Sequence, residues 1–195
     1  MNDPRPTFRD AVAQAGRVVA ATSDDDLDRP TPCDDFDVRT LLGHLDAVIR
    51  RITHALEHGS VDGTPSIVDG FADGDRTTTW KSDVAALERC VDDDATLDRT
   101  VTVPFGSMPG RAALAVYTSE LTTHAWDLAA AIGRLDLLED ALAQRSLSAM
   151  ESALPAEPRG GPIPFGPVVE VASDAGAYER LAGWLGRDPV WARAE

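Results

Sequence analysis

The run from about Ala112 to Ile132 is predicted to form one uninterrupted helix, and it contains the polar residues Glu120, His124 and Asp127. Glu120 and His124 are four residues apart, so their side chains lie on a single helix face, and Asp127 continues that face one turn later. Burial of a carboxylate and an imidazole is unfavourable unless something neutralises them, and a divalent metal does so with one bond to each. The chain must then supply further ligands, and the best candidate is His44 on another helix. The pair lies at the edge of an apolar stripe made of Ala113, Tyr117, Leu121, Leu128 and Ala131.

Apolar residues at three- and four-residue spacing predict further helices along the chain. Their approximate ranges are residues 7–22, 38–58, 76–91 and 137–153, with a short helix at 175–185. The 38–58 helix has clear ends, because Asp37 is a natural N-cap and Gly59 is the expected stop. His44 flanks the buried stripe of that helix. Long amphipathic helices in one compact chain predict a mainly all-α fold, a four-helix bundle.

The remaining segments predict connections within a single domain spanning residues 1–195. Residues 60–74 are rich in Gly, Asp, Pro and Ser and read as a loop. The acidic triplet at 92–94 reads as a solvated turn. The β-branched stretch 100–103, closed by residues 104–110, predicts a short strand or hairpin insertion. Five prolines between residues 155 and 167 predict an extended C-terminal segment.

The excess of acidic residues limits the classes of partner that the chain is expected to bind. Acidic residues outnumber basic ones 33 to 18, for a formal charge of −15, and Lys81 is the only lysine. Such a field repels phosphate backbones and anionic lipids, so we expect no nucleic-acid and no membrane partner. Cys33 and Cys90 are far apart and have no C-x-x-C spacing, which favours neither a disulfide framework nor a zinc ribbon. No signal-like or membrane-spanning apolar run is present, so we expect a cytoplasmic protein.

Residue spacing alone leaves two interpretations of the histidines open: they are metal ligands, or they are ordinary structural residues. Glu-x-x-x-His pairs also occur on many helices as ordinary solvated contacts. His54 and His58 illustrate the structural interpretation, since His58 lies in the last turn of its helix, where a cation meets the helix dipole favourably. A glutamate on a core-facing stripe is harder to explain without a partner, which favours a metal site at Glu120 and His124.

Two segments and the chain terminus carry a resemblance to a known family. The first segment is Arg29-Pro-Thr-Pro-Cys-Asp-Asp-Phe-Asp-Val-Arg-Thr-Leu-Leu-Gly-His44-Leu, and the second is Glu120-Leu-Thr-Thr-His124-Ala-Trp-Asp-Leu-Ala. The closing stretches Pro164-Phe-Gly-Pro-Val-Val and Leu185-Gly-Arg-Asp-Pro189 also fit. The chain resembles the actinobacterial metal-binding proteins related to the N-terminal domain of mycothiol-dependent maleylpyruvate isomerase, in the DinB-like superfamily.

The resemblance implies a DinB-like four-helix bundle in which His44, Glu120 and His124 coordinate a divalent metal. Zinc is the metal usually assigned in the family, and nickel or another ion would also suit these ligands. The resemblance further implies mycothiol as the thiol cosubstrate. Phe36 departs from the tryptophan that relatives often carry. The chain also leaves no room for the second α/β domain of the isomerase, so isomerisation of maleylpyruvate itself is not implied.

Three protein ligands leave a zinc-like ion with an open position, the arrangement of catalytic sites. The first hypothesis is therefore a metal-dependent thiol transferase or isomerase that takes a small-molecule thiol and an electrophilic substrate. The alternative is a non-catalytic module in which the ion only ties two helices together. Asp127 has two equally ranked roles, as an orienting partner of an imidazole or as a solvent-facing charge. A homodimer is a candidate assembly that the sequence does not decide.

Cys33 is a tempting fourth ligand. If the helix begins near Val38, however, His44 lies roughly 9 Å along its axis, at ~1.5 Å per residue. Cys33 would have to fold back across that distance to reach the site. We therefore expect Cys33 to be a packed thiol in the loop that enters the helix.

Overall fold

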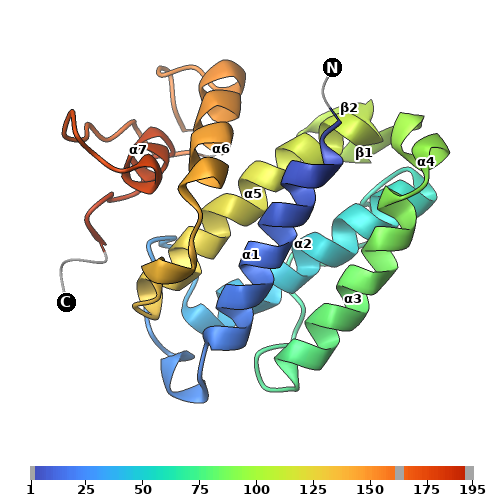
Figure 1. Cartoon of the computed structure of the whole chain (residues 1–195), viewed down its shortest axis with the longest axis horizontal. Coiled ribbons are helices and arrows are strands. Elements are labelled where there is room, and N and C mark those ends of the chain that lie inside the picture. Colours follow the sequence, from blue (N-terminus) through green and yellow to red (C-terminus); the bar gives the residue numbers. More distant parts are fainter. Residues whose placement is uncertain (1–2, 161–164, 192–195) are drawn as a thin grey trace.

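Four long helices form the body of the molecule in the computed structural model, which describes residues 3–160 and 165–191. Neighbouring helices contact one another in the order α1, α5, α2, α3, and α3 returns to α1 (Figure 1). The predicted mainly all-α bundle is confirmed, and α2 and α5 lie side by side as expected. The four helices are α1 (Arg5–Ala21), α2 (Val38–His58), α3 (Arg76–Val91) and α5 (Gly110–Ala131).

Helix α2 begins and ends where its capping residues place it. The Asp37 side chain accepts a hydrogen bond from the backbone N–H of Thr40, and Gly59 adopts the left-handed conformation with φ 87°. A left-handed residue after a helix lets the chain turn away, and glycine does so without steric cost. Both ends agree with the prediction, so local capping chemistry is sufficient to define this helix.

Helix α5 is buried on nearly all sides rather than along one stripe. Its neighbours are α1, α2 and the later helices α6 and α7, so it runs through the centre of the molecule (Figure 1). All of its residues from Leu121 to Ala131 are buried. The expectation of an ordinary amphipathic helix was therefore wrong for α5, because its polar residues also face other parts of the protein. Those polar residues must find partners inside the fold.

The acidic triplet at 92–94 is not a simple solvated turn. Asp93 caps a short helix, α4 (Asp94–Asp98), by accepting hydrogen bonds from the backbone N–H of Ala95 and the hydroxyl of Thr96. The predicted hairpin follows, with β1 (Thr100–Val103) and β2 (Gly106–Pro109) paired antiparallel. A bridge between Ser60 and Thr102 attaches this hairpin to the end of α2.

The C-terminal third forms a second, smaller hydrophobic cluster against α5. Helix α6 (Asp140–Ala153) begins three residues later than predicted, because a 3₁₀ turn at Leu135–Leu137 precedes it. Helix α7 (Ala177–Trp184) is slightly shorter than the predicted range. Between them, the described residues have no helix or strand, in agreement with the predicted extended segment, although its residues 161–164 lie outside the description. No described helix is long and apolar enough to span a membrane.

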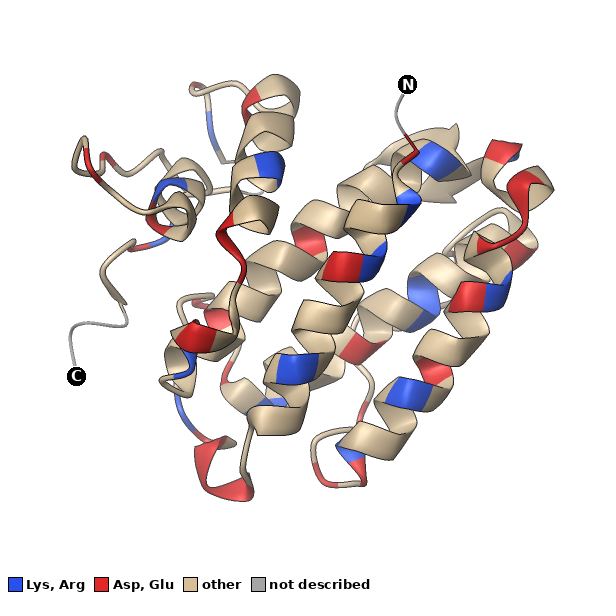
Figure 2. Cartoon of the chain, in the orientation of Figure 1, with Lys and Arg blue, Asp and Glu red and all other residues tan. Residues whose placement is uncertain are grey.

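Acidic and basic residues alternate over the helix surfaces, as Figure 2 shows for α1 and α3. Arg9 of α1 pairs with Glu88 at 2.8 Å and with Asp92 at 2.6 Å. Other arginines pair with carboxylates in the same way, among them Arg17 with Glu139 and Arg111 with Asp98.

Candidate metal centre

His44, Glu120 and His124 converge between α2 and α5. Glu120 Oε1 lies 3.3 Å from His44 Nε2 and 3.5 Å from His124 Nε2, and the three donor atoms lie within 4.8 Å of one another. Ligands at about 2.0–2.2 Å around a tetrahedral ion are about 3.3–3.6 Å apart. The two imidazole–carboxylate distances therefore match the edges of such a coordination shell. The residue set singled out in the sequence is brought together by the fold.

A hydrogen bond at Nδ1 fixes the orientation of the His44 ring. Its Nδ1 lies 2.8 Å from the backbone carbonyl oxygen of Ser66, and a carbonyl can only accept, so Nδ1 carries the proton. The neutral ring then keeps a lone pair on Nε2, which faces Glu120. Gly43 makes this contact feasible, because a Cβ there would lie 2.8 Å from the carbonyl oxygen of Val68. The 60–74 loop can thus lie directly on α2.

The His124 ring is held by a buried charge pair. Its Nδ1 lies 2.9 Å from Asp127, whose fully buried carboxylate also accepts hydrogen bonds from Arg187 at 2.8 and 3.0 Å. Burial alone would lower the pKa of His124, but the hydrogen bonds to Asp127 and Glu120 raise it to about 9. A cation bound at Nε2 would take the place of the proton there. The solvent-facing alternative for Asp127 was wrong, because its side chain is 0% exposed.

Glu120 is the most accessible of the three donors. Its side chain is 26% exposed, compared with 12% for His44 and 10% for His124. Burial would raise the pKa of Glu120, but hydrogen bonds to the two histidines outweigh it and hold the pKa far below its usual range. Phe36 packs against both imidazoles, with ring centroids 5.1 Å from His44 and 6.3 Å from His124. Phe36 therefore covers one side of the three-donor site, and solvent reaches the site at Glu120.

Cys33 lies closer to the centre than the helix geometry predicted. Donor atoms of Cys33, His124 and Asp127 lie within 4.8 Å of one another. The segment before α2 folds back on itself, with Pro30 bridged to Asp37 and the Thr31 hydroxyl donating to the carbonyl of Phe36. The distance argument was wrong because it measured only along the helix axis.

The Cys33 group is nevertheless a poor cation site. It includes neither His44 nor Glu120. The Arg187 guanidinium already neutralises its carboxylate, Asp127, and a second positive charge there would be repelled. Burial raises the pKa of the Cys33 thiol to about 11, so the metal-free thiol stays protonated near neutral pH. Cys33 packs beside the centre as a half-buried thiol, which agrees with the predicted role in the entry loop.

Two partners of the centre were not predicted from the sequence. The Ser66 contact uses a backbone carbonyl, for which a sequence carries no residue-type signal. Arg187 lies in the closing stretch that contributed to the family resemblance, but nothing local connects it with Asp127, 60 residues earlier. The rings of His54 and His58 lie against each other in a tilted pair with centroids 4.4 Å apart, and neither residue belongs to the two donor groups found among the described residues.

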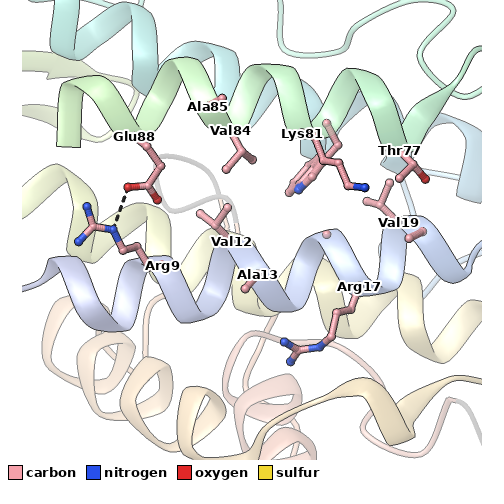
Figure 3. Close-up of a pocket in the computed structure, with 13 residues that line it drawn as sticks. Arg9, Val12, Ala13, Arg17, Val19, Thr77, Lys81, Val84, Ala85 and Glu88 are labelled. Carbon is pink, nitrogen blue, oxygen red and sulfur yellow. Dashed lines mark hydrogen bonds and ion pairs between the residues drawn. The ribbon is translucent and has the colours of Figure 1, made fainter. Parts of the chain in front are cut away.

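A separate groove runs between α1 and α3, with a volume of about 660 Å³. Figure 3 shows valines of both helices facing each other across it, and the amine of Lys81 reaching over it from α3. Its lining contains none of the three converging donors. The groove is therefore not the site of metal chemistry.

The fold and the centre together define a class: helical bundles that carry a His–Glu–His donor set between two neighbouring helices. The model of the mycothiol maleylpyruvate isomerase N-terminal domain matches residues 8–129, and the chain belongs to that family. Crystal structures of the mycothiol-dependent maleylpyruvate isomerase and of a mutant share the fold, with TM-scores of 0.54 and 0.52 at 15% and 16% identity. Each match covers 75% of this chain and 67% of the isomerase chain.

Two sequence relatives extend over almost the whole chain. They are the uncharacterized proteins Rv0738 and MT0763 of Mycobacterium tuberculosis, each 26% identical over 189 residues. The alignment covers 95% of this chain and 98% of each relative. The resemblance to an actinobacterial family is thereby confirmed.

Proposed function

We propose that this protein binds one divalent metal ion through His44, Glu120 and His124, and uses it to activate a low-molecular-weight thiol. Mycothiol is the thiol that the family relationship supports. The proposed reaction class is thiol transfer to an electrophile, or a thiol-assisted isomerisation. The observation that supports the proposal is the convergence of the three donor atoms within 4.8 Å, with Glu120 Oε1 lying 3.3 and 3.5 Å from the two imidazole Nε2 atoms.

The donor set suits zinc best among common divalent ions. Two neutral imidazoles and one carboxylate are ordinary zinc ligands, and three protein ligands leave a fourth position for a small molecule. When bound, such an ion acts as a Lewis acid that lowers the pKa of a coordinated thiol. The exposed side of Glu120 gives that position contact with solvent.

The residues around the donors hold the site in its binding geometry. The Ser66 carbonyl and the Asp127 carboxylate keep the Nδ1 atom of each histidine engaged, so that Nε2 is the atom each ring presents to a cation. Arg187 in turn fixes Asp127. Phe36 covers the imidazoles and excludes water from that side. Because these contacts exist without the ion, little reorganisation is needed when it binds.

The alternative is an ion that only ties α2 to α5, with no role in catalysis. Titration of the cobalt-substituted protein with mycothiol separates the two. In the catalytic case the thiol enters the open position, changes the visible spectrum of the ion, and reacts with a generic electrophile faster than free thiol does. An unchanged spectrum and rate with mycothiol and other small thiols would favour the structural ion.

A further inference from the structure

The groove between α1 and α3 lies at the seam opposite the one that holds the candidate metal centre, because the four helices pack in the order α1, α5, α2, α3. Its volume of about 660 Å³ is in the range of small-molecule sites. Small and β-branched residues of the two helices make up most of its apolar lining, namely Val12, Ala13, Gly16, Val19, Ala20, Val84 and Ala85. The groove therefore offers an apolar surface along both helices.

Trp80 of α3 forms the floor of this groove. Its side chain is only 6% exposed, although it belongs to the lining. A Cβ at Gly16 of α1 would lie 2.6 Å from Trp80 Nε1, so glycine at this position gives the indole room against α1. The contact joins the two helices below the groove, while Val12 and Val84 face each other across it (Figure 3).

The two ends of the groove differ in charge. At one end Arg9 Nε donates to Glu88 at 2.8 Å, so the two charges neutralise each other (Figure 3). At the other end lie Thr77 and Lys81, and the Lys81 amine reaches over the groove toward Thr77 (Figure 3). These two residues are four apart, so they share one face of α3. The Lys81 end therefore has an excess of positive charge.

Three hydrogen-bond donors near this end have no protein acceptor. The Lys81 amine, the Thr77 hydroxyl and Trp80 Nε1 make no hydrogen bond or ion pair with another described residue. Arg17 also belongs to the lining, but it pairs with Glu139 and points away from the groove (Figure 3). An unpaired ammonium beside an apolar surface is complementary to a molecule with an apolar body and one anionic end.

We propose that the α1–α3 groove binds one molecule of a medium-chain fatty carboxylate, with the alkyl chain along the valines and the carboxylate at Lys81. The lining runs along α3 from Thr77 to Glu88, which is ~16 Å at ~1.5 Å per residue and accommodates such a chain. Contact with the valines removes the chain from water, and the Lys81 amine and Thr77 hydroxyl donate to the carboxylate.

This site is independent of the proposed metal chemistry, because its lining contains none of the three converging donors. A second copy of the chain is a less suitable occupant of the groove. Each copy has a formal charge of −15, so two copies repel each other, whereas a small monoanion meets the local positive charge of Lys81.

The first test locates the ligand. The indole Nε1–H resonance of Trp80 is assigned by its loss in the Trp80→Phe spectrum, and the protein is titrated with octanoate or with acetate. We expect octanoate to shift this resonance with one-to-one saturation, and acetate, which lacks the chain, to leave it in place. Val84→Phe narrows the groove opposite Val12 and should abolish the shift. A Trp80 resonance that does not respond to octanoate below its micelle concentration would overturn the site.

The second test measures the role of the charged end by calorimetric titration with octanoate and with 1-octanol. We expect octanoate to bind about fivefold more tightly, which is the contribution of an ion pair open to solvent on one side. Lys81→Met should remove this preference without changing the affinity for octanol. Arg89→Met is the matched control, because it removes an exposed positive charge from the same helix outside the lining. Equal loss in both variants, or a preference that survives in Lys81→Met, would refute the carboxylate end of the site.

Sedimentation analysis distinguishes the other occupant. We expect the wild type and Val84→Phe to have the same molecular mass, because the groove holds a small molecule and not a subunit interface. A wild-type dimer that Val84→Phe converts to a monomer would show that a second copy covers the groove, and the proposal would fail.

Discussion

His44 Nε2 and Glu120 Oε1 lie 3.3 Å apart although 76 residues separate them in the sequence. Their contact joins α2 to α5, and His124 completes the group from one turn further along α5. An ion bound there would bond to both helices, and only the folded chain brings the donors together. The proposed metal binding would therefore be coupled to the stability of the fold.

Replacement of His124 by alanine should abolish stoichiometric metal binding and lower the melting temperature of the metal-loaded protein. An ion present at a hundredfold excess over its dissociation constant stabilises the fold by about 2.7 kcal/mol, and that contribution would be lost. Elemental analysis and thermal denaturation measure both effects. His54→Ala is the control and should retain its metal. A one-to-one metal content in His124→Ala would contradict the assignment.

Replacement of Asp127 by asparagine should weaken metal affinity by roughly 10- to 100-fold while leaving all three ligands in place. The neutral amide has a different hydrogen-bonding pattern toward His124 Nδ1 and loses the charge pairing with Arg187. Competition with a chromophoric chelator gives the affinity. Asp136→Asn removes an exposed carboxylate paired with Arg134 and should have no effect. Equal affinities for the two variants would exclude an orienting role for Asp127.

Replacement of Gly43 by alanine should displace the 60–74 loop and weaken metal binding without touching a ligand. The new Cβ would lie 2.8 Å from the Val68 carbonyl oxygen, and that backbone must move to relieve the contact. The loop also supplies the Ser66 carbonyl that holds His44. Gly74→Ala, whose Cβ would meet nothing closer than 3.6 Å, is the control in the same loop. Metal affinity and the exchange rate of the Val68 amide, which donates to Gly43, report the displacement.

The buried carboxylate of Asp46 should make stability depend on pH. Burial raises its pKa to about 7, although Arg50 acts to lower it and Asp83 raises it further. Arg50 Nε is only 2.7 Å away, yet neither Asp46 oxygen has a partner with hydrogen-bond geometry. The unfolded chain releases this proton near pH 3.8, so the stability contributed by the bound proton falls as pH rises from there to about 7.

Asp46→Asn should therefore match the wild type near pH 4 and be more stable above pH 7, by on the order of 2–4 kcal/mol. Urea unfolding at several pH values measures the difference. Asp28→Asn, which removes a 94% exposed carboxylate, is the control for the loss of one negative charge. A constant difference between Asp46→Asn and wild type across the pH range would show that Asp46 does not hold a proton in the folded state.

Local sequence signals, namely the spacing of apolar residues and the capping residues, were sufficient to predict most of the helices. The ends of α2 follow from Asp37 and Gly59, because capping involves residues within one turn of the helix end. The same rules missed α4, where three consecutive acidic residues resemble a solvated turn. The i, i+4 spacing of Glu120 and His124 already placed two donors on one face, His44 was the best further candidate on another helix, and the family resemblance supported the same three residues.

The surroundings of those donors were decided only by the tertiary structure. Cys33 reaches His124 because a proline-rich segment folds back through a bridge that no helical spacing predicts. Arg187 neutralises Asp127 because of packing between segments distant in sequence. The sequence by itself determined which residues could bind a metal and which helices carry them. The orientation, shielding and charge balance of those residues depend on through-space contacts, which exist only once the whole chain has packed.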